Sequence, residues 1–118
     1  MTPAGPGPNH SGPTLSGYGT VIVGGAVMGS SLAYWLSENS DHDETILVVE
    51  MDPTYQLAST TLSEASIRHQ FSEPVNILLS MFATEFIASF HHNVQVGGES
   101  PDLGFRDTGY LFLATEDG

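Results

Sequence analysis

The chain has 118 residues and no cysteine, which allows one small domain and excludes disulfides, thiolate metal ligands and a cysteine nucleophile. Its 14 acidic residues face only two arginines, Arg68 and Arg106, and the net charge of −12 disfavours binding to nucleic acids and to anionic membranes. The sequence contains neither a membrane-spanning apolar run nor a secretory signal pattern, so we expect a cytoplasmic protein.

Residues 1–17 are rich in proline, glycine and serine, and this composition predicts a disordered tail. The apolar run "TVIV" at 20–23 predicts a buried strand, and the continuous apolar run at 45–50 predicts a second one. Between them, residues 26–38 carry apolar side chains at helical spacing. Strand, helix and strand in this order predict a βαβ unit with parallel strands and a right-handed crossover.

The first strand and the helix are joined by a glycine-containing turn, which comprises Gly24, Gly25, Ala26, Val27, Met28 and Gly29. In a G-x-G-x-x-G turn, the glycines let the backbone approach a pyrophosphate, which then lies on the N-terminus of the helix. Here Ala26 occupies the position of the middle glycine, and its methyl group intrudes on the phosphate approach. Ser30 and Ser31 follow and offer further hydroxyl or backbone donors.

The second strand ends on Glu50, which lies 26 residues after Gly24 and 21 residues after Gly29. A carboxylate at this place typically binds the ribose hydroxyls of an adenosine. The following residues, Met51 and Asp52, supply no cation for a 2′-phosphate, so the sequence disfavours NADP. The alternative is a structural turn beside a solvated glutamate, and periodicity alone does not distinguish FAD from NAD.

Residues 51–74 are polar and predict a loop with a short helical piece, whereas the apolar spacing at 73–92 predicts a second helix. Pro74 lies near the start of that helix, where its missing N–H costs nothing. The run "GYLFLA" at 109–114 predicts a final strand, for which the chain provides no later partner. We therefore expect the N-terminal part of a larger protein.

Four segments resemble FAD-dependent oxidoreductases of the D-amino-acid oxidase superfamily, the group of sarcosine oxidase, glycine oxidase and related amine dehydrogenases. The segments are "VIVGGAVMGSSLAYWL", "ILVVEMDPTY", "ASTTLSEASIRHQFSEPVNILLSMFATEF" and "GYLFLA". They cover roughly residues 19–116, and the block "STTLSEASIRHQFS" is the most specific, because a plain Rossmann dehydrogenase has no reason to carry it. The departures from the family are Ala26 and the short length of the chain.

The resemblance implies an α/β fold, a Rossmann-like FAD-binding βαβ unit of a GR2-type flavoprotein, incomplete and followed by the start of an antiparallel substrate-domain sheet. The expected boundaries are a tail at 1–17, the N-terminal part of the FAD-binding domain at 18–96 and the start of the substrate domain at 97–118. The closing residues would form the first hairpin of that second domain.

The resemblance also implies non-covalent FAD and hydride transfer to flavin N5 from the carbon of a C–N bond in an amine or amino acid, N-methylated ones included. The electron acceptor would be oxygen or a carrier. No catalytic residue is assigned. The implied cofactor-binding positions are Gly24, Gly25, Ala26 and Gly29 at the pyrophosphate, Glu50 at the ribose, Ser59 and Thr60 near the flavin phosphates or ribityl chain, and Arg68 and His69 near the isoalloxazine. The neighbouring residues Val27, Met28 and Met51 are also expected to bind the cofactor.

Several alternatives stay open. Arg68 is either an anchor for flavin or a substrate carboxylate, or a partner of Glu64 or Glu73 in an ion pair. His69 is either a base or flavin link, or a polar loop histidine; the stretch "STTL" lacks the histidine that attaches flavin covalently in some relatives. The carboxylates are scattered, so no metal site is expected. The rival functions are an NAD-dependent dehydrogenase and a truncated, non-catalytic nucleotide-binding fragment.

Overall fold

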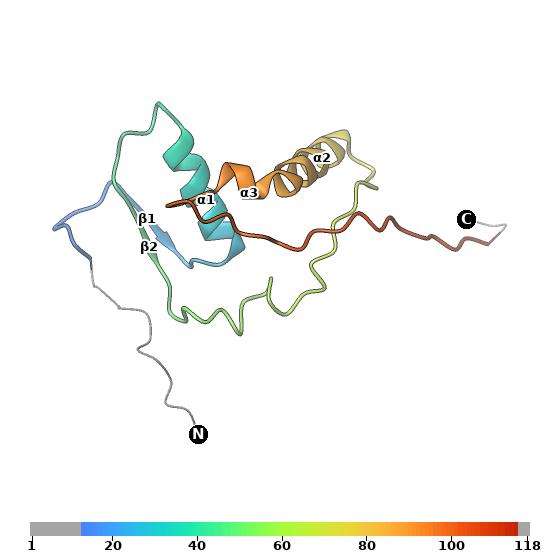
Figure 1. The fold of residues 1–118 in the computed structure, drawn as a ribbon, viewed down its shortest axis with the longest axis horizontal. Helices are drawn as coiled ribbons and strands as arrows, with labels where there is room; N and C mark the ends of the chain where they lie inside the picture. Colours follow the sequence, from blue (N-terminus) through green and yellow to red (C-terminus); the bar gives the residue numbers. More distant parts are fainter. Residues whose placement is uncertain (1–12, 116–118) are drawn as a thin grey trace, which may run out of the picture. The chain divides into compact units, whose positions relative to one another are not determined.

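The computed structural model describes residues 13–115 and divides the chain into two units, residues 1–65 and residues 66–118. Figure 1 shows the order of the elements, which is strand, helix and strand in the first unit and two helices in the second. Most of the predicted tail at 1–17 lies outside the described residues. Each unit is therefore considered by itself.

The first unit is the predicted βαβ unit. Strand β1 spans Thr20–Val23, helix α1 spans Val27–Glu38 and strand β2 spans Ile46–Val49. The two strands pair in parallel, with Ile22 opposite Val48 in the register. The predicted parallel pair and its connecting helix are confirmed, and they place the turn before α1 beside the carboxyl end of β2 (Figure 1).

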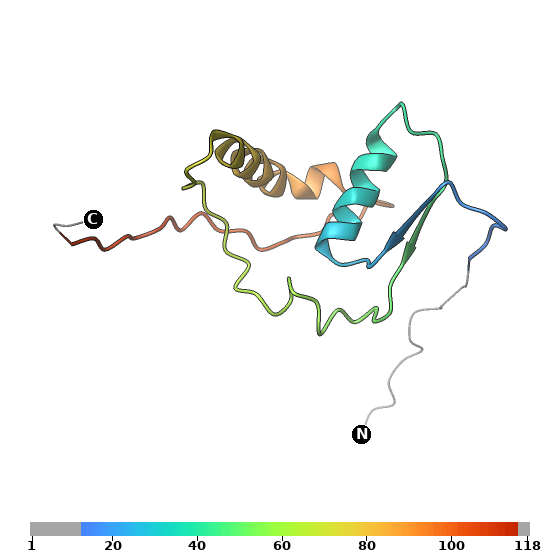
Figure 2. The ribbon, with the colours of Figure 1, turned by 180° about the vertical axis from the view of Figure 1, so that it is seen from behind.

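The two faces of this small sheet differ in their burial. Ile22 is only 7% exposed and lies on the face that α1 covers, whereas Val21 and Val23 point to the opposite face and are 54% and 87% exposed. This difference follows from the alternation of side chains along a strand. Figure 2 shows α1 beside the two strands from behind. The packed face of the sheet is thus the face that α1 covers, and the glycine turn leads from β1 into α1 on this face.

The second unit contains helix α2, Pro74–Ala88, and the short helix α3, Phe90–Asn93. Pro74 lies in the first turn of α2, as predicted. The prediction of one uninterrupted helix over 73–92 is wrong, because the helix breaks at Ser89. The hydroxyl of Ser89 donates to the carbonyl oxygen of Glu85 at 2.9 Å and accepts from the side chain of Asn93 at 3.0 Å. The equivalent bond from the hydroxyl of Thr84 to the carbonyl oxygen of Ser80, at 2.9 Å, lies inside α2 and does not interrupt it, so the hydroxyl bond of Ser89 is not by itself the cause of the break.

The segment after α3 differs from the sequence prediction. Residues 109–114 form no strand, and the nearest pairing in the described part of the second unit is an isolated antiparallel bridge between Val96 and Glu99. A strand exists only where a neighbour satisfies its backbone groups, and Leu111 and Leu113 are 86% and 92% exposed. The assignment of residues 97–118 to a substrate domain stays a prediction. The loop before α2 contains turns instead of the short helical piece that was expected.

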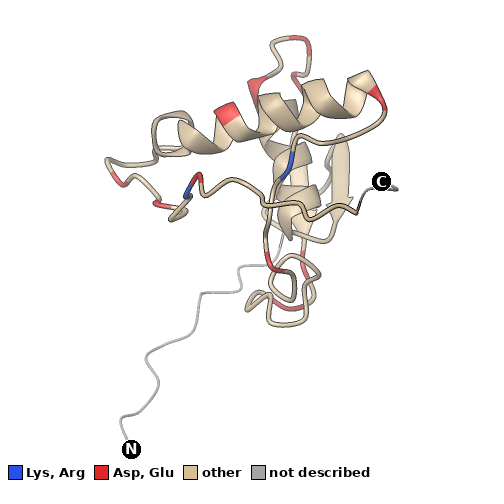
Figure 3. Cartoon of the chain, turned by 90° about the vertical axis from the view of Figure 1, so that its right-hand side faces the viewer, with Lys and Arg blue, Asp and Glu red and all other residues tan. Residues whose placement is uncertain are grey.

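Figure 3 shows the acidic residues distributed over the loops and helices of the chain. Both arginines, Arg68 and Arg106, belong to the second unit, so the first unit contains neither lysine nor arginine. Among the helices that the structure describes, none has the length and apolar character needed to cross a bilayer. Any anion bound by the first unit must therefore be held without ion pairs to a lysine or arginine of that unit.

Candidate cofactor-binding site

The turn between β1 and α1 begins at Gly24, whose φ of +96° lies in the left-handed region that disfavours other residues. Its backbone N–H donates to the carbonyl oxygen of Val49 at 2.7 Å, which extends the pairing of β1 with β2 by one residue. The glycine thus ends the strand and reverses the direction of the chain. The predicted tight turn is present at the position that the sequence indicated.

Two further glycines allow close backbone approach. A methyl group placed on Gly29 would collide with the carbonyl oxygen of Gly24 and lie 3.2 Å from Cγ2 of Ile22. A methyl group on Gly25 would lie 2.9 Å from the hydroxyl oxygen of Tyr55 and 3.4 Å from Cβ of Glu50. The missing side chains let the first turn of α1 pack against β1 and let two other side chains reach the turn. This is the geometry expected of a nucleotide-binding turn.

Ala26 is the N-cap residue of α1 and has an ordinary extended conformation, with φ −65° and ψ −170°. Its side chain makes no capping hydrogen bond. The first backbone N–H groups of a helix have no partner within the helix, so those of Val27, Met28 and Gly29 are available to an anion. The side chains of Val27 and Met28 are exposed, which leaves their backbone as the part suited to phosphate binding.

Ser30 has a different role from the one that the sequence suggested. Its hydroxyl donates to the carbonyl oxygen of Gly25, and its backbone N–H donates to the carbonyl oxygen of Ala26 at 2.9 Å. Both donors are therefore used to hold the turn against the helix. We correct the sequence interpretation accordingly, because neither donor of Ser30 remains for a phosphate in this arrangement.

Glu50 follows β2 directly and connects the two ends of the site. Its Oε2 atom accepts the backbone N–H of Gly25 at 2.7 Å, and its Oε1 atom accepts the backbone N–H of Asp52 at 2.8 Å. The hydrogen bond from Asp52 and then that from Gly25 lower the pKa of Glu50 below its usual range. The carboxylate that the sequence assigned to a ribose therefore lies, ionised at neutral pH, directly beside the glycine turn.

The other predicted residues of the first unit lie in the loop after β2. Met51 is 96% exposed, and Ser59 and Thr60 lie in a series of turns. The carbonyl oxygen of Thr60 accepts hydrogen bonds from the hydroxyl of Ser63 at 2.8 Å and from its backbone N–H at 3.2 Å. Within residues 13–65, no hydrogen bond joins Ser59 or Thr60 to the glycine turn, so their cofactor role stays a prediction.

Arg68 and His69 belong to the second unit, and their cofactor role stays a prediction. The guanidinium carbon of Arg68 lies 5.3 Å from the ring centre of Phe71, a cation–π distance. No ion pair of Arg68 is found in the described part of the chain. His69 shares a hydrogen bond of 2.8 Å between its Nε2 atom and the hydroxyl of Thr84 on α2, which fits a structural histidine.

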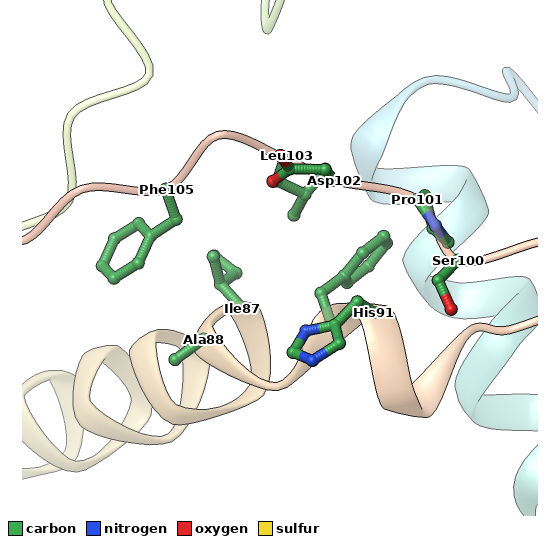
Figure 4. A pocket seen from close by; sticks show the side chains of 9 residues that line it. Ile87, Ala88, His91, Ser100, Pro101, Asp102, Leu103 and Phe105 are labelled. Carbon is green, nitrogen blue, oxygen red and sulfur yellow. The ribbon is translucent and has the colours of Figure 1, made fainter.

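The second unit also contains an open hollow of about 490 Å³ between α2, α3 and residues 100–105. Figure 4 shows Ile87, His91, Asp102 and Phe105 around it. The carboxylate of Asp102 already accepts the backbone N–H of Gly104 at 2.8 Å. The hollow contains none of the predicted cofactor residues, and within residues 13–115 no three side chains are grouped as metal ligands.

Sequence reasoning did not single out Tyr55, which lies beside the glycine turn in the structure. Its ring reaches the glycine turn from the loop after β2, and its hydroxyl oxygen is the nearest atom to the place where a side chain on Gly25 would lie. The available signal was the "DPTY" sequence at 52–55, a turn pattern that begins two residues after Glu50. A turn there sends the chain back toward the end of the strand.

Comparison with known proteins assigns the family. The family described as FAD dependent oxidoreductase (DAO) matches residues 20–118. The chain is 50% identical over 101 residues to "FAD-dependent oxidoreductase domain-containing protein 1" of Xenopus laevis, which covers 83% of this chain and 20% of the relative. The protein of the same name from Bos taurus is 48% identical over 101 residues, with 83% and 21% covered. The homologue from Drosophila melanogaster is 40% identical over 97 residues, with 82% and 18% covered.

No solved structure matches the chain. The chain spans about a fifth of the length of the curated relatives it matches. The matched residues include the glycine turn, Glu50 and the loop that carries Tyr55. The cofactor predicted from the resemblance is confirmed at the level of the family, which is FAD-dependent. The chain belongs to the DAO family of FAD-dependent oxidoreductases.

Proposed function

We propose that this chain holds the adenosine diphosphate part of FAD in an enzyme that oxidises the C–N bond of an amine or amino acid, N-methylated ones included. Dependence on FAD and oxidoreductase activity follow from the family. The substrate class is supported by the resemblance of the "STTLSEASIRHQFS" block to sarcosine and glycine oxidases. A small-molecule substrate and an electron acceptor, oxygen or a carrier, complete the proposed reaction.

One observation carries this proposal: the ionised Glu50 carboxylate lies at 2.7 Å from the backbone nitrogen of Gly25, next to the uncapped N-terminus of α1. The ribose and the diphosphate of an adenosine diphosphate need a carboxylate and a helix N-terminus side by side. A diphosphate needs N–H donors and the positive end of a helix dipole. A ribose needs a hydrogen-bond acceptor for its hydroxyls. The residues present therefore fit FAD.

Bound FAD supplies a hydride acceptor at flavin N5. The residues of this chain bind and orient the cofactor. The backbone N–H groups of Val27, Met28 and Gly29 would hold the diphosphate, and the carboxylate of Glu50 would accept hydrogen bonds from the ribose. Because the first unit contains no lysine or arginine, backbone dipoles provide its attraction for the phosphates.

The test is to purify the protein encoded by the complete reading frame and record its absorption spectrum. We expect flavin bands, and we expect acid precipitation to release the flavin into the supernatant, as a non-covalent cofactor requires. Anaerobic addition of primary amines, amino acids and N-methylated amino acids should bleach the flavin with at least one of these classes. Bleaching by none of them would overturn the substrate class.

A colourless protein that binds NADH would instead support the nicotinamide-dependent alternative. Comparison of reoxidation by air and by an artificial acceptor would then distinguish an oxidase from a dehydrogenase. Fast reoxidation by air indicates oxygen as the acceptor. Slow reoxidation by air with fast reduction of the artificial acceptor indicates a carrier.

A further inference from the structure

We propose that Tyr55 is a further cofactor-binding residue, whose phenol hydroxyl binds the ribose–diphosphate part of FAD beside Glu50. The inference rests on the proposed function, because it concerns the same adenosine diphosphate site. It adds a side chain from the loop after β2 to a site otherwise built from the glycine turn and one carboxylate. The hydroxyl of Tyr55 is the group assigned this role.

Three groups lie together at Gly25: its own backbone N–H, the carboxylate of Glu50 and the hydroxyl of Tyr55. The backbone N–H of Gly25 donates to Oε2 of Glu50 at 2.7 Å. On the side where Gly25 lacks a side chain, the hydroxyl oxygen of Tyr55 lies 2.9 Å from the position that a methyl group would take. The phenol and the carboxylate therefore approach the same residue of the turn. A ligand that contacts Glu50 at this turn lies within reach of the Tyr55 hydroxyl.

The backbone of the loop holds Tyr55 in place without using its hydroxyl. The backbone N–H of Tyr55 donates to the carbonyl oxygen of Asp52 at 3.0 Å, and its own carbonyl accepts the N–H of Ala58 at 3.0 Å. The carboxylate of Asp52 also binds the hydroxyl of Thr54 at 2.6 Å and its N–H at 3.0 Å. These bonds support a φ of +55° at Tyr55, which is uncommon for a residue with a side chain.

The hydroxyl of Tyr55 also has the hydrogen-bonding chemistry that a ribose or a phosphate requires. A tyrosine hydroxyl both donates and accepts hydrogen bonds, and among residues 13–115 the structure shows no hydrogen-bond partner for that of Tyr55. The side chain is 37% exposed, so a ligand can reach it. In a unit without lysine or arginine, a neutral O–H is a side-chain donor that can serve a phosphate or a ribose oxygen. The hydroxyl of Tyr55 is thus a side-chain donor that this site offers in addition to the backbone N–H groups and the carboxylate of Glu50.

The test uses the protein encoded by the complete reading frame, prepared without flavin and titrated with FAD and separately with ADP. The variant Tyr55→Phe removes the hydroxyl and keeps the ring. We expect it to weaken the binding of FAD and of ADP by the same factor, about threefold to tenfold, which corresponds to one neutral hydrogen bond. The matched control is Tyr110→Phe in the second unit, which should leave both affinities unchanged.

The melting temperature of the flavin-free protein separates binding from folding. We expect Tyr55→Phe to melt with the wild type when no ligand is present. Unchanged affinities for FAD and ADP would overturn the inference while leaving the proposed function intact. A lower melting temperature of the flavin-free variant, sufficient to explain the weaker binding, would also overturn it. Failure of the wild type to bind either FAD or ADP would overturn the proposed function, and this inference with it.

Discussion

The carboxylate of Glu50 joins the end of β2 to the glycine turn, because its Oε2 atom lies 2.7 Å from the backbone nitrogen of Gly25. Its Oε1 atom simultaneously accepts the N–H of Asp52 at 2.8 Å. The same side chain thus shapes the turn and presents a charge to the place where a ribose is expected. We therefore expect Glu50 to contribute both to the binding of the cofactor and to the preorganisation of the turn.

Glu50→Gln should weaken FAD binding by roughly tenfold or more, because hydrogen bonds to a charged acceptor are stronger than those to a neutral amide. The glutamine amide also replaces one acceptor oxygen of the carboxylate by an NH₂ donor. This NH₂ group would face the backbone N–H of either Gly25 or Asp52 and would not accept a hydrogen bond from it. Titration of the flavin-free protein with FAD measures the effect. The control is Glu38→Gln at the end of α1, for which we expect no change. Equal affinities of Glu50→Gln and the wild type would contradict the assignment.

The lowered pKa of Glu50 predicts how stability depends on pH. A carboxyl whose pKa is lower in the folded state contributes stability above its ordinary value of 4.5, and this contribution is lost as the pH falls through the lowered folded value. The pKa of Asp52 is also lowered, mainly by the side chain of Thr54. We expect the melting temperature to fall below pH about 4.5 and to fall less in Glu50→Gln. Parallel curves for the two proteins would show that Glu50 contributes nothing.

Gly29→Ala should destabilise the protein by about 1–3 kcal/mol or more, because its methyl group would collide with the carbonyl oxygen of Gly24. The obstacle is backbone, which cannot move away like a flexible side chain. Thermal melting measures the loss. Gly17→Ala is the matched control, since no atom lies within 4 Å of the added methyl group there. Similar melting temperatures for the two variants would argue against close packing of α1 on the turn.

Ala26→Gly should change binding more than stability. Glycine costs about 0.4–1 kcal/mol through the greater freedom of the unfolded chain, but Ala26 is the N-cap of α1, where glycine is preferred to alanine by a similar amount, so we expect little net change in the melting temperature. Removal of the methyl group from the phosphate approach should raise the affinity for FAD, by up to roughly tenfold. Melting curves and FAD titrations of the same preparation measure both effects. A lower affinity would show that the methyl group is not an obstacle.

Much of the site could be predicted from the sequence because its signals are local. The short apolar run before Gly24 and the helical spacing after it indicate β1 and α1 without knowledge of any distant contact. The spacing from Gly29 to Glu50 places a carboxylate at the end of the neighbouring strand, since the carboxyl ends of parallel strands in a βαβ unit lie at the same edge of the sheet. Pro74 likewise marks the start of α2, because its ring suits the first turn of a helix.

Other features depended on contacts that no local pattern contains. The bond between Glu50 and Gly25 and the approach of Tyr55 to the same glycine connect residues far apart in the sequence. Ser30 looked like a phosphate donor, and only the folded turn shows its hydroxyl bound to the carbonyl of Gly25. The break at Ser89 was hidden by an apolar spacing that continues across both α2 and α3.

The glycine turn, the βαβ order and the carboxylate at the end of the second strand follow from neighbouring residues and from side-chain periodicity, so the amino-acid sequence alone specifies them. Which side chains meet at Gly25, and whether the apolar run at 109–114 pairs as a strand, depends instead on contacts between separate segments. A strand requires a partner for its backbone N–H and C=O groups, and a binding site requires groups brought together from separate elements. The pairing of β1 with β2 and the approach of Glu50 and Tyr55 to Gly25 meet these conditions, whereas residues 109–114 have no strand partner in the described part of the chain.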